Sequence, residues 1–392
     1  MSIKKMSDIA VQVDNALASI DSKVDWLSYL SPVDNDANWQ TFKVNKFSKA
    51  PVLRYLPIPE NYSELLTDVR NIPIDDVNEP ALQALFSEKR MELELQIDLV
   101  QNRNTEGFLP ISIELFGAAE PSLLQTANDI LGTVSTDGGD TNDGTCDDLV
   151  AAAMSEFKYY RSKVEDFTAK IEVMDDLNSM MMVHNGDFKI ARSVKIPLQR
   201  IRPLIAHEVG THVVTRYNGR CQPIKLLEHG MAHYDPLQEG LGTLSEYLAG
   251  YLPPERLRTI AARVVATHLA IQGSNIQEIF SVLHYDHDIP EETAFDVAVR
   301  ACRGGGLTKD TVYLRGLGEL LAYLAEGGDL AFLYLGKFSM GQRFTVQKLL
   351  DQDSLVPAKL LPRHLLDEKC LERLARVRNL ELKQLYQEQV EI

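Results

Sequence analysis

Apolar residues recur every three to four positions along most of the chain, and this period predicts helices. Residues 8–30 and 79–102 both show it, and Pro80 suits the first turn of the second helix. Between them, residues 38–62 contain several prolines and aromatic residues without that period, which predicts ordered loop and short extended pieces. The N-terminal region is therefore expected to be mainly helical.

The pattern breaks at residues 135–148, where aspartate, glycine and asparagine replace apolar residues. Their spacing is not that of an EF-hand, because Gly144 stands at the third-ligand position if Asp140 is the first ligand. A solvated loop or domain junction is predicted rather than a calcium site. We therefore expect a mainly helical N-terminal region, 1–135, packed on a larger domain, 145–392.

A small sheet is predicted near the beginning of the larger domain. Residues 170–176 and 179–183 have the short apolar pattern of strands. Asn185-Gly186 is typical of a two-residue hairpin turn, and residues 188–196 supply the returning strand. Because the rest of the chain reads as helix after helix, the predicted fold class is α+β, mostly helical, with a small β-sheet.

The helix predicted after this sheet carries HEVGTH, residues 207–212. His207 and His212 are five residues apart, which is roughly 140° around an ideal helix, so a regular helix cannot direct both toward one metal. A single wide turn, a π-bulge, returns such positions to nearly one face, and Gly210 between them eases the distortion. The motif predicts either ordinary polar residues on a surface helix or a metal site with a wide turn at residues 209–211.

A third ligand would decide between these alternatives. Glu239 lies downstream in DPLQEGLGTLSEYLAGY, and it completes the His, His, Glu donor set of catalytic zinc sites. Gly240 and Gly242 would let two helix backbones approach each other. Glu246 lies on roughly the same helix face as Glu239, where it would orient a ligand histidine.

One zinc ion per chain is therefore expected. Its predicted ligands are His207, His212 and Glu239. Glu208 is next to a ligand without being one, and it is predicted to act as the general base. The rival pair His229 and His233 lies in a predicted loop, so helical spacing does not apply to it.

Three blocks together resemble those of a known family. HEVGTH, QEGLG (238–242) and RACRGGGLTKDTVYLRGL (300–317) are similar to blocks of the flavohaemoglobin-expression-modulating QEGLA-motif family, which is related to the eukaryotic microtubule-associated tyrosine carboxypeptidases. The similarity runs from about residue 40 to the C-terminal helices and is strongest over 197–325, with Gly242 in place of the signature's alanine. The resemblance implies a zincin-like metallopeptidase core in which the motif histidines and the downstream glutamate bind zinc and the motif glutamate is catalytic.

A carboxypeptidase also binds a free α-carboxylate, which calls for a fixed cation. In the third block, Thr308 is a predicted helix N-cap, and Lys309 and Tyr313 share one helix face. Lys309, Arg315 and Arg303 are the predicted substrate-binding residues, and Tyr313 is predicted to stabilise the oxyanion. The alternative is a capped surface helix with a half-buried tyrosine.

Composition restricts the partners. A formal charge of −16 over 392 residues argues against nucleic acid or an anionic membrane as partner, and no apolar run is long enough to span a membrane. Tubulin is an acidic polymer, so it is not expected as a substrate for this acidic chain. The four scattered cysteines lack a C-x-x-C pair and predict reduced thiols in a cytoplasmic protein.

The predicted function is a zinc-dependent metallopeptidase, a carboxypeptidase that removes a C-terminal residue from a peptide or protein. The contrasting alternative is a non-catalytic, zinc-bearing regulatory or peptide-binding protein. Glu208 weighs against that alternative, because a purely structural site needs no base. An endopeptidase or aminopeptidase would share the metal site but would not need a cation for the C-terminal carboxylate.

Overall fold

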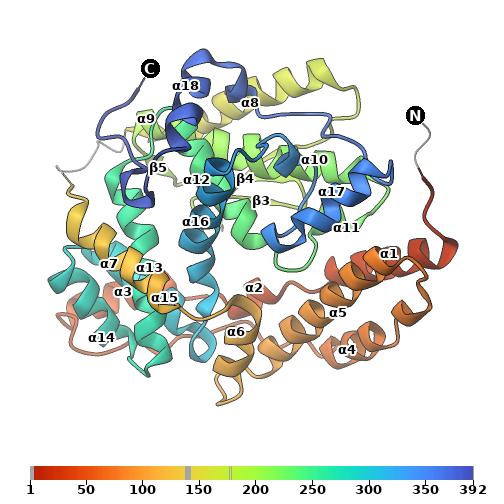
Figure 1. Ribbon diagram of the computed structural model, residues 1–392. Helices are drawn as coiled ribbons and strands as arrows, with labels where there is room; N and C mark the ends of the chain where they lie inside the picture. The colour runs from red at the N-terminus through yellow and green to blue at the C-terminus, as the bar shows by residue number, and fades with distance from the viewer. Residues whose placement is uncertain (1–3, 137–142, 176, 178, 392) are drawn as a thin grey trace. The chain divides into compact units, whose positions relative to one another are not determined.

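The computed structural model describes residues 4–136, 143–175, 177 and 179–391 (Figure 1). The described chain is mostly helical with two small sheets, which confirms the α+β prediction. It forms two compact units, each assembled from separate stretches. The first consists of Met1–Asp14, Thr136–Pro254 and Gly316–Ile392, and the second of Asn15–Ser135 and Glu255–Arg315. No helix among the described residues is long and apolar enough to cross a membrane.

The predicted junction at residues 135–148 is only partly described. Residues 137–142, which include Asp140, lie outside the described part of the chain. The division into an N-terminal region, 1–135, and a metallopeptidase-like domain, 145–392, stays a prediction.

A three-stranded sheet precedes the motif helix in the first unit, as predicted. Its order is β2 (Ile171–Met174), β4 (Asp187–Ala191), β3 (Met181–His184), with β2 parallel and β3 antiparallel to β4. Asn185 and Gly186 have φ of 51° and 86°. Positive φ at both central residues is the requirement of the type I′ hairpin turn, and it explains why Asn-Gly is found here.

The end of the predicted returning strand belongs to a separate two-stranded sheet. There β5 (Lys195–Ile196) pairs antiparallel with β1 (Gly144–Thr145). Thr145 then caps α8 (Cys146–Lys163), because its hydroxyl accepts from the Asp148 N–H and the Asp148 carboxylate accepts from the Thr145 N–H.

The motif helix changes geometry along its length. α9 (Leu198–Ile205) leads into a π-helical segment, η2 (Ala206–Val213), and regular α10 (Val214–Arg220) follows. The Val214 N–H donates to the Val209 carbonyl, five residues back. The predicted wide turn is therefore confirmed, and it extends over the whole HEVGTH motif.

The second half of the first unit is helical. Its helices are α11 (Leu226–His229), α12 (Asp235–Leu248), α17 (Arg343–Asp351) and α18 (Glu368–Val377). α10 can pack closely on α11 because Gly219 has no side chain; a Cβ there would lie 2.0 Å from the Leu227 carbonyl oxygen. The buried Asn218 amide donates to the carbonyls of Tyr334 and Leu360. Asn218 and Gly219 thus serve tertiary packing, and both lie inside α10, which ends at Arg220.

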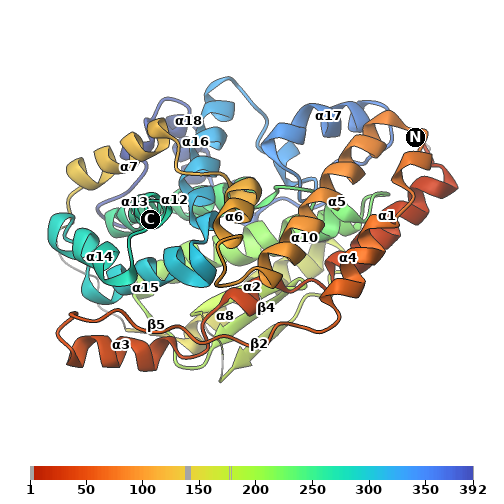
Figure 2. The ribbon, with the colours of Figure 1, turned by 90° about the horizontal axis from the view of Figure 1, so that it is seen from below.

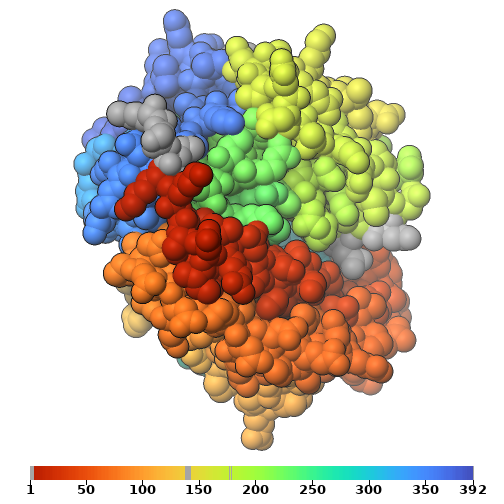
Figure 3. Space-filling view, turned by 90° about the vertical axis from the view of Figure 1, so that its right-hand side faces the viewer, coloured from red at the N-terminus to blue at the C-terminus, as the bar shows by residue number. Residues whose placement is uncertain are grey.

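The second unit is built from helices. They are α2 (Trp26–Leu30), α3 (Asn35–Val44), α4 (Tyr62–Arg70), α5 (Pro80–Gln101), α6 (Phe108–Phe116), α7 (Pro121–Thr133), α14 (Ile276–Ser281) and α15 (Glu291–Cys302). α5 confirms the helix predicted at 79–102, and α4 packs along it (Figure 2). Figure 3 shows one face of the molecule, on which residues 4–100 are coloured red to orange. Three further helices contain a unit boundary: α1 (Asp8–Asp21), α13 (Pro254–Ile271) and α16 (Thr311–Ala325).

The predicted loop at residues 38–62 is wrong at its beginning, where the chain is helical in α3. Trp39 and Phe42 of α3 pack against Phe295, and Phe42 also contacts Phe280 edge to face. Burial of these rings stabilises a helix whose own sequence pattern is weak.

Candidate metal centre

The three predicted ligands lie together in the first unit. The ligand atoms of His207, His212 and Glu239 are all within 4.8 Å of one another, and His207 Nε2 is 3.9 Å from a Glu239 carboxylate oxygen. Ligands of one tetrahedral zinc ion are about 3.4 Å apart, so a small inward movement would close these atoms on a metal. Two imidazoles and a carboxylate match the donor set of catalytic zinc. The three side chains therefore form a candidate metal site.

The π-helical segment η2 makes this meeting of the histidines possible. With about 4.4 residues per turn, positions five apart return to one face, and the His207 and His212 ring centroids are 5.1 Å apart. The Thr211 hydroxyl follows the same spacing, since it donates to the Ala206 carbonyl at 3.2 Å. Gly210 packs under His364, whose Nδ1 would lie 3.4 Å from a Cβ placed there.

α12 presents Glu239, Gly242 and Glu246 to η2 on one face. A Cβ at Gly242 would lie 2.5 Å from His207 Nε2, closer than real Cβ contacts. The glycine that replaces the alanine of the QEGLA signature therefore lies directly beside a candidate ligand. In this chain the glycine leaves the space that the imidazole occupies.

Gly240 faces a different neighbour. Its Cβ would lie 2.8 Å from the backbone of Gly316 in α16, and a Cβ at Gly316 would lie 1.8 Å from the Pro236 carbonyl oxygen. The expected close approach of helix backbones is confirmed, but at Gly240 it joins α12 to α16 rather than to the motif helix. Gly316 belongs to the third sequence block, so that block supports the helix that carries Glu239.

Glu246 connects His207 to Arg200. The Glu246 side chain is fully buried, with one oxygen 2.8 Å from His207 Nδ1 and the other 2.6 Å from an Arg200 Nη2. A carboxylate can only accept, so His207 Nδ1 carries the proton and donates. His207 Nε2, the nitrogen beside Glu239, then has its lone pair directed to the candidate site. No sequence signal indicated Arg200.

The two histidines have different electrostatic environments. Burial lowers the pKa of His207, but the hydrogen bond and charge of Glu246 outweigh burial and raise this pKa overall. Burial, together with repulsion from His207, lowers the pKa of His212 to about 4. His212 is therefore neutral at pH 7, which is the ligating form, and its Nδ1 lies 3.5 Å from Gln238 Oε1.

Glu208 is half-buried beside the ligands, where its charge also raises the pKa of His207. Of the rival pair, His229 ends α11 and His233 is an exposed residue with φ of 57°. Neither belongs to the group of three found among the described residues.

The predicted substrate-binding residues belong to the second unit. The Lys309 ammonium is 5.9 Å from the Tyr313 ring centre, as their helical spacing predicted. Arg315 donates to the Phe116 and Ala118 carbonyls and to Glu120, and so it fixes the loop between α6 and α7.

The N-cap prediction for Thr308 is wrong. Thr308 begins a 3₁₀ turn, η5 (Thr308–Asp310), and its hydroxyl donates to the Ser112 carbonyl rather than capping a helix. The Ser112 hydroxyl in turn accepts from the Thr308 N–H. This exchange of hydrogen bonds ties η5 to α6.

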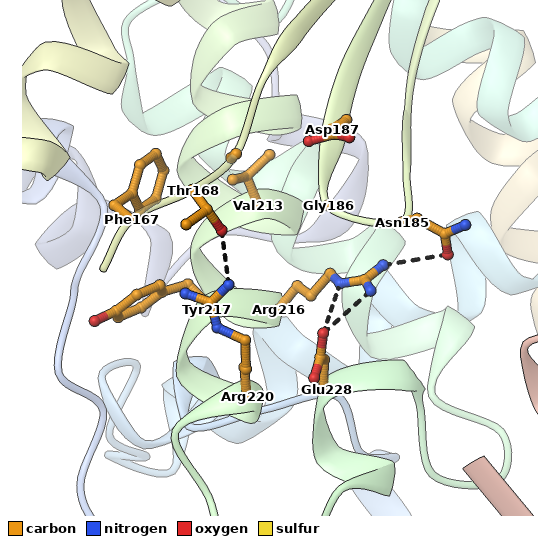
Figure 4. A pocket seen from close by; sticks show the side chains of 11 residues that line it. Phe167, Thr168, Asn185, Gly186, Asp187, Val213, Arg216, Tyr217, Arg220 and Glu228 are labelled. Atoms are coloured by element: carbon orange, nitrogen blue, oxygen red, sulfur yellow. Dashed lines mark hydrogen bonds and ion pairs between the residues drawn. The ribbon is translucent and has the colours of Figure 1, made fainter. Parts of the chain in front are cut away.

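A small hollow of about 70 Å³ lies beside α10 in the first unit (Figure 4). Arg216 donates to Glu228 and Asn185, and Arg220 donates to Thr168, as the dashed lines show. Both arginines of this hollow are thus paired within the protein.

Comparison with known families gives a match over most of the chain. The model of the family described as "Microtubule-associated tyrosine carboxypeptidase" matches residues 40–381. This range includes the three candidate ligands, Glu208 and the third sequence block. No curated protein matches the sequence.

Proposed function

Because the chain belongs to the microtubule-associated tyrosine carboxypeptidase family, we propose that it is a zinc-dependent metallopeptidase that removes a C-terminal residue from a peptide or protein. The observation that carries the proposal is the group of His207, His212 and Glu239, with Glu208 between the two histidines in sequence. A sheet followed by the motif helix supports a zincin-like core.

The proposed mechanism assigns one role to each side chain. Zinc, when bound, would supply Lewis acidity that polarises the scissile carbonyl and lowers the pKa of the attacking water. Glu208 accepts the proton of this water and then donates it to the leaving amine. Glu246 keeps the His207 imidazole in one tautomer and orientation.

We propose a peptide or protein C terminus as the substrate. Lys309, Arg303 and Arg315 remain the residues predicted to bind its carboxylate, and Tyr313 remains predicted to stabilise the oxyanion. The family's name refers to microtubules, but the formal charge of −16 disfavours an acidic polymer such as tubulin. We therefore retain peptides without a strong negative charge as the first substrates to test.

Glu208→Gln tests the mechanism, because it keeps the shape of the side chain and removes the base. Hydrolysis should fall by roughly 10²–10⁴-fold, the usual contribution of a general base. Zinc content and melting temperature should change little. Glu172→Gln, at a half-buried strand residue in the same unit that is paired with Lys189, is the matched control and should keep full activity. A mixed peptide library read by mass spectrometry supplies the substrate.

Two further measurements separate the alternatives. A C-terminally amidated peptide should resist cleavage, and equal cleavage of the amide would indicate an endopeptidase or aminopeptidase instead. Unchanged turnover in Glu208→Gln would refute the mechanism. Stoichiometric zinc without cleavage of any peptide would favour the non-catalytic, peptide-binding alternative.

A further inference from the structure

Arg303 is a buried arginine that has no acceptor in the described structure. It begins η4 (Arg303–Gly305) in the second unit and is only 6 % exposed. Among the described residues its side chain makes no hydrogen bond or ion pair, and its Nε is buried without a partner. Burial and repulsion from Arg300 lower its pKa to about 10, so the guanidinium is still charged at neutral pH.

The nearby carboxylate, that of Asp310, is already paired with a neighbouring arginine. Arg300 donates through Nε and Nη2 to the two oxygens of Asp310, both at 2.6 Å. Arg263 Nε is 3.8 Å from an Asp310 oxygen, close enough for an ion pair but too far for a hydrogen bond, and this buried Nε has no hydrogen-bond partner. Burial would raise the pKa of Asp310, but the three guanidiniums hold this pKa far below its ordinary value. One carboxylate thus faces three guanidinium groups.

Aromatic side chains fix the position of this cluster. The Tyr313 ring lies 4.5 Å from the Arg263 guanidinium carbon, as in a cation–π contact. The Tyr55 hydroxyl accepts from the Gly304 N–H at 2.9 Å. A Cβ at Gly304 would lie 2.4 Å from the Phe108 ring, so the chain beside Arg303 is held against α6. The arginines are therefore placed by packing rather than left on a mobile surface.

Two other arginines that the described structure buries, Arg258 and Arg373, are satisfied. Arg258 donates to the carbonyls of Leu131 and Val134, and Arg373 donates to Glu391 and to the Leu248 carbonyl. Leaving a buried charge unpaired is strongly unfavourable, which is why such groups are normally paired. Arg303 differs from Arg258 and Arg373 in this respect. A ligand with an oxygen acceptor would supply the hydrogen-bond partner that its guanidinium lacks.

We propose that Arg303 and Arg263, beside Tyr313, form a buried oxyanion site that binds a carboxylate such as the one at a peptide's free C terminus. Guanidinium forks match carboxylate and phosphate alike, so oxyanion recognition is the shared chemistry. The choice of carboxylate rests on the proposed function, whereas anion binding by these arginines does not. Arg263 lies outside every motif that the sequence indicated.

Binding is measured by titration calorimetry on the full chain carrying Glu208→Gln, so that the peptide is not consumed. The probes are a short uncharged peptide with a free C terminus, the same peptide amidated, and inorganic phosphate at matched ionic strength. The free acid should bind at least about tenfold more tightly than the amide, the value of one charge-assisted hydrogen bond. Arg303→Met and Arg263→Met should each abolish that preference. Arg70→Met removes an exposed, paired arginine of the same unit and should keep it.

The possible results separate the proposed anion site from the proposed function. An unchanged acid-to-amide ratio in Arg303→Met would overturn the site, and binding of phosphate alone would overturn the carboxylate assignment. If Arg303→Met does not fold, Arg303→Lys keeps the charge without the fork and should weaken binding of the free acid. Acid-selective binding in a chain that cleaves no peptide would leave the site standing and refute the proposed function. If Arg303→Met and Arg263→Met, each with Glu208 intact, still cleave the free acid in preference to the amide, the anion site is refuted and the proposed function stands.

Discussion

His207 and Arg303 are both buried, basic side chains, but their surroundings differ. His207 donates to Glu246, which also accepts from Arg200, so a chain of charge-assisted hydrogen bonds holds the imidazole. Arg303 has packed neighbours but no acceptor among the described residues. The hydrogen bonds on the Nδ1 side of His207 are therefore complete, and they orient the imidazole before a metal binds. The Arg303 guanidinium gains a hydrogen-bond acceptor only when an anion binds.

The largest expected effect comes from removing one metal ligand. His212→Ala should abolish stoichiometric zinc, because two remaining ligands cannot retain the ion at ordinary affinity. Metal analysis of purified protein gives the answer. His233→Ala, at the exposed histidine of the rival pair, is the control and should keep one zinc per chain. Full zinc retention in His212→Ala would show that the candidate ligand set is wrong.

Substitutions of Glu246 and of Arg303 should have opposite effects on the free energy of unfolding. Glu246→Ala leaves Arg200 and His207 without their shared acceptor, and it should lower the free energy of unfolding by about 3–5 kcal/mol. Arg303→Met removes a charge that has no partner, so in the absence of a ligand it should be neutral or stabilising by up to about 4 kcal/mol. Urea unfolding of both variants makes the comparison. Equal destabilisation would show that Arg303 is satisfied after all.

Gly242→Ala tests how tightly the His207 imidazole is packed against α12. The added Cβ would lie 2.5 Å from His207 Nε2, so the ring must move. We expect a loss of about 1–3 kcal/mol in unfolding free energy from overpacking, together with weaker zinc binding. Gly132→Ala in α7 is the matched control, because nothing lies within 4 Å of its Cβ. An alanine variant with unchanged zinc affinity would show that the imidazole has room to adjust.

The sequence predicted the features that depend on local spacing. Residues five apart in HEVGTH required a wide turn, and Asn185-Gly186 required a hairpin, because both conclusions follow from backbone geometry alone. The His, His, Glu set followed from donor chemistry together with the QEGLG block.

The features that the sequence missed depend on contacts between distant segments. Arg200 reaches Glu246 across 46 residues, and Arg263 approaches Asp310 from another helix. α3 forms because its aromatic residues are buried by Phe280 and Phe295, which a local pattern cannot show. No periodicity encodes such partners, so they appear only when the chain is folded.

The smallest expected effect concerns acid stability and begins from His364, which packs on Gly210 of the wide turn. Burial, and then the positive charge of Arg202, lower the pKa of His364 to about 3, with Asp367 acting in the opposite direction. The unfolded chain, with an ordinary pKa of 6.5, therefore binds this proton first as pH falls. The stability that His364 contributes is complete above about pH 6.5 and is lost progressively toward pH 3.

His364→Leu should therefore flatten the pH dependence of stability. Between pH 6.5 and 5, above most carboxylate titrations, the wild type should lose up to about 1.4 kcal/mol per pH unit more than the variant. Urea unfolding with saturating zinc measures this, because the contributions of His207 and His212 are then common to both proteins. Gln272→Leu, at a residue near the end of α13 that has no titratable group, should keep the wild-type slope. If His364→Leu has that same slope, His364 accepts a proton in the folded protein. A charge would then lie directly against the turn that carries both ligand histidines.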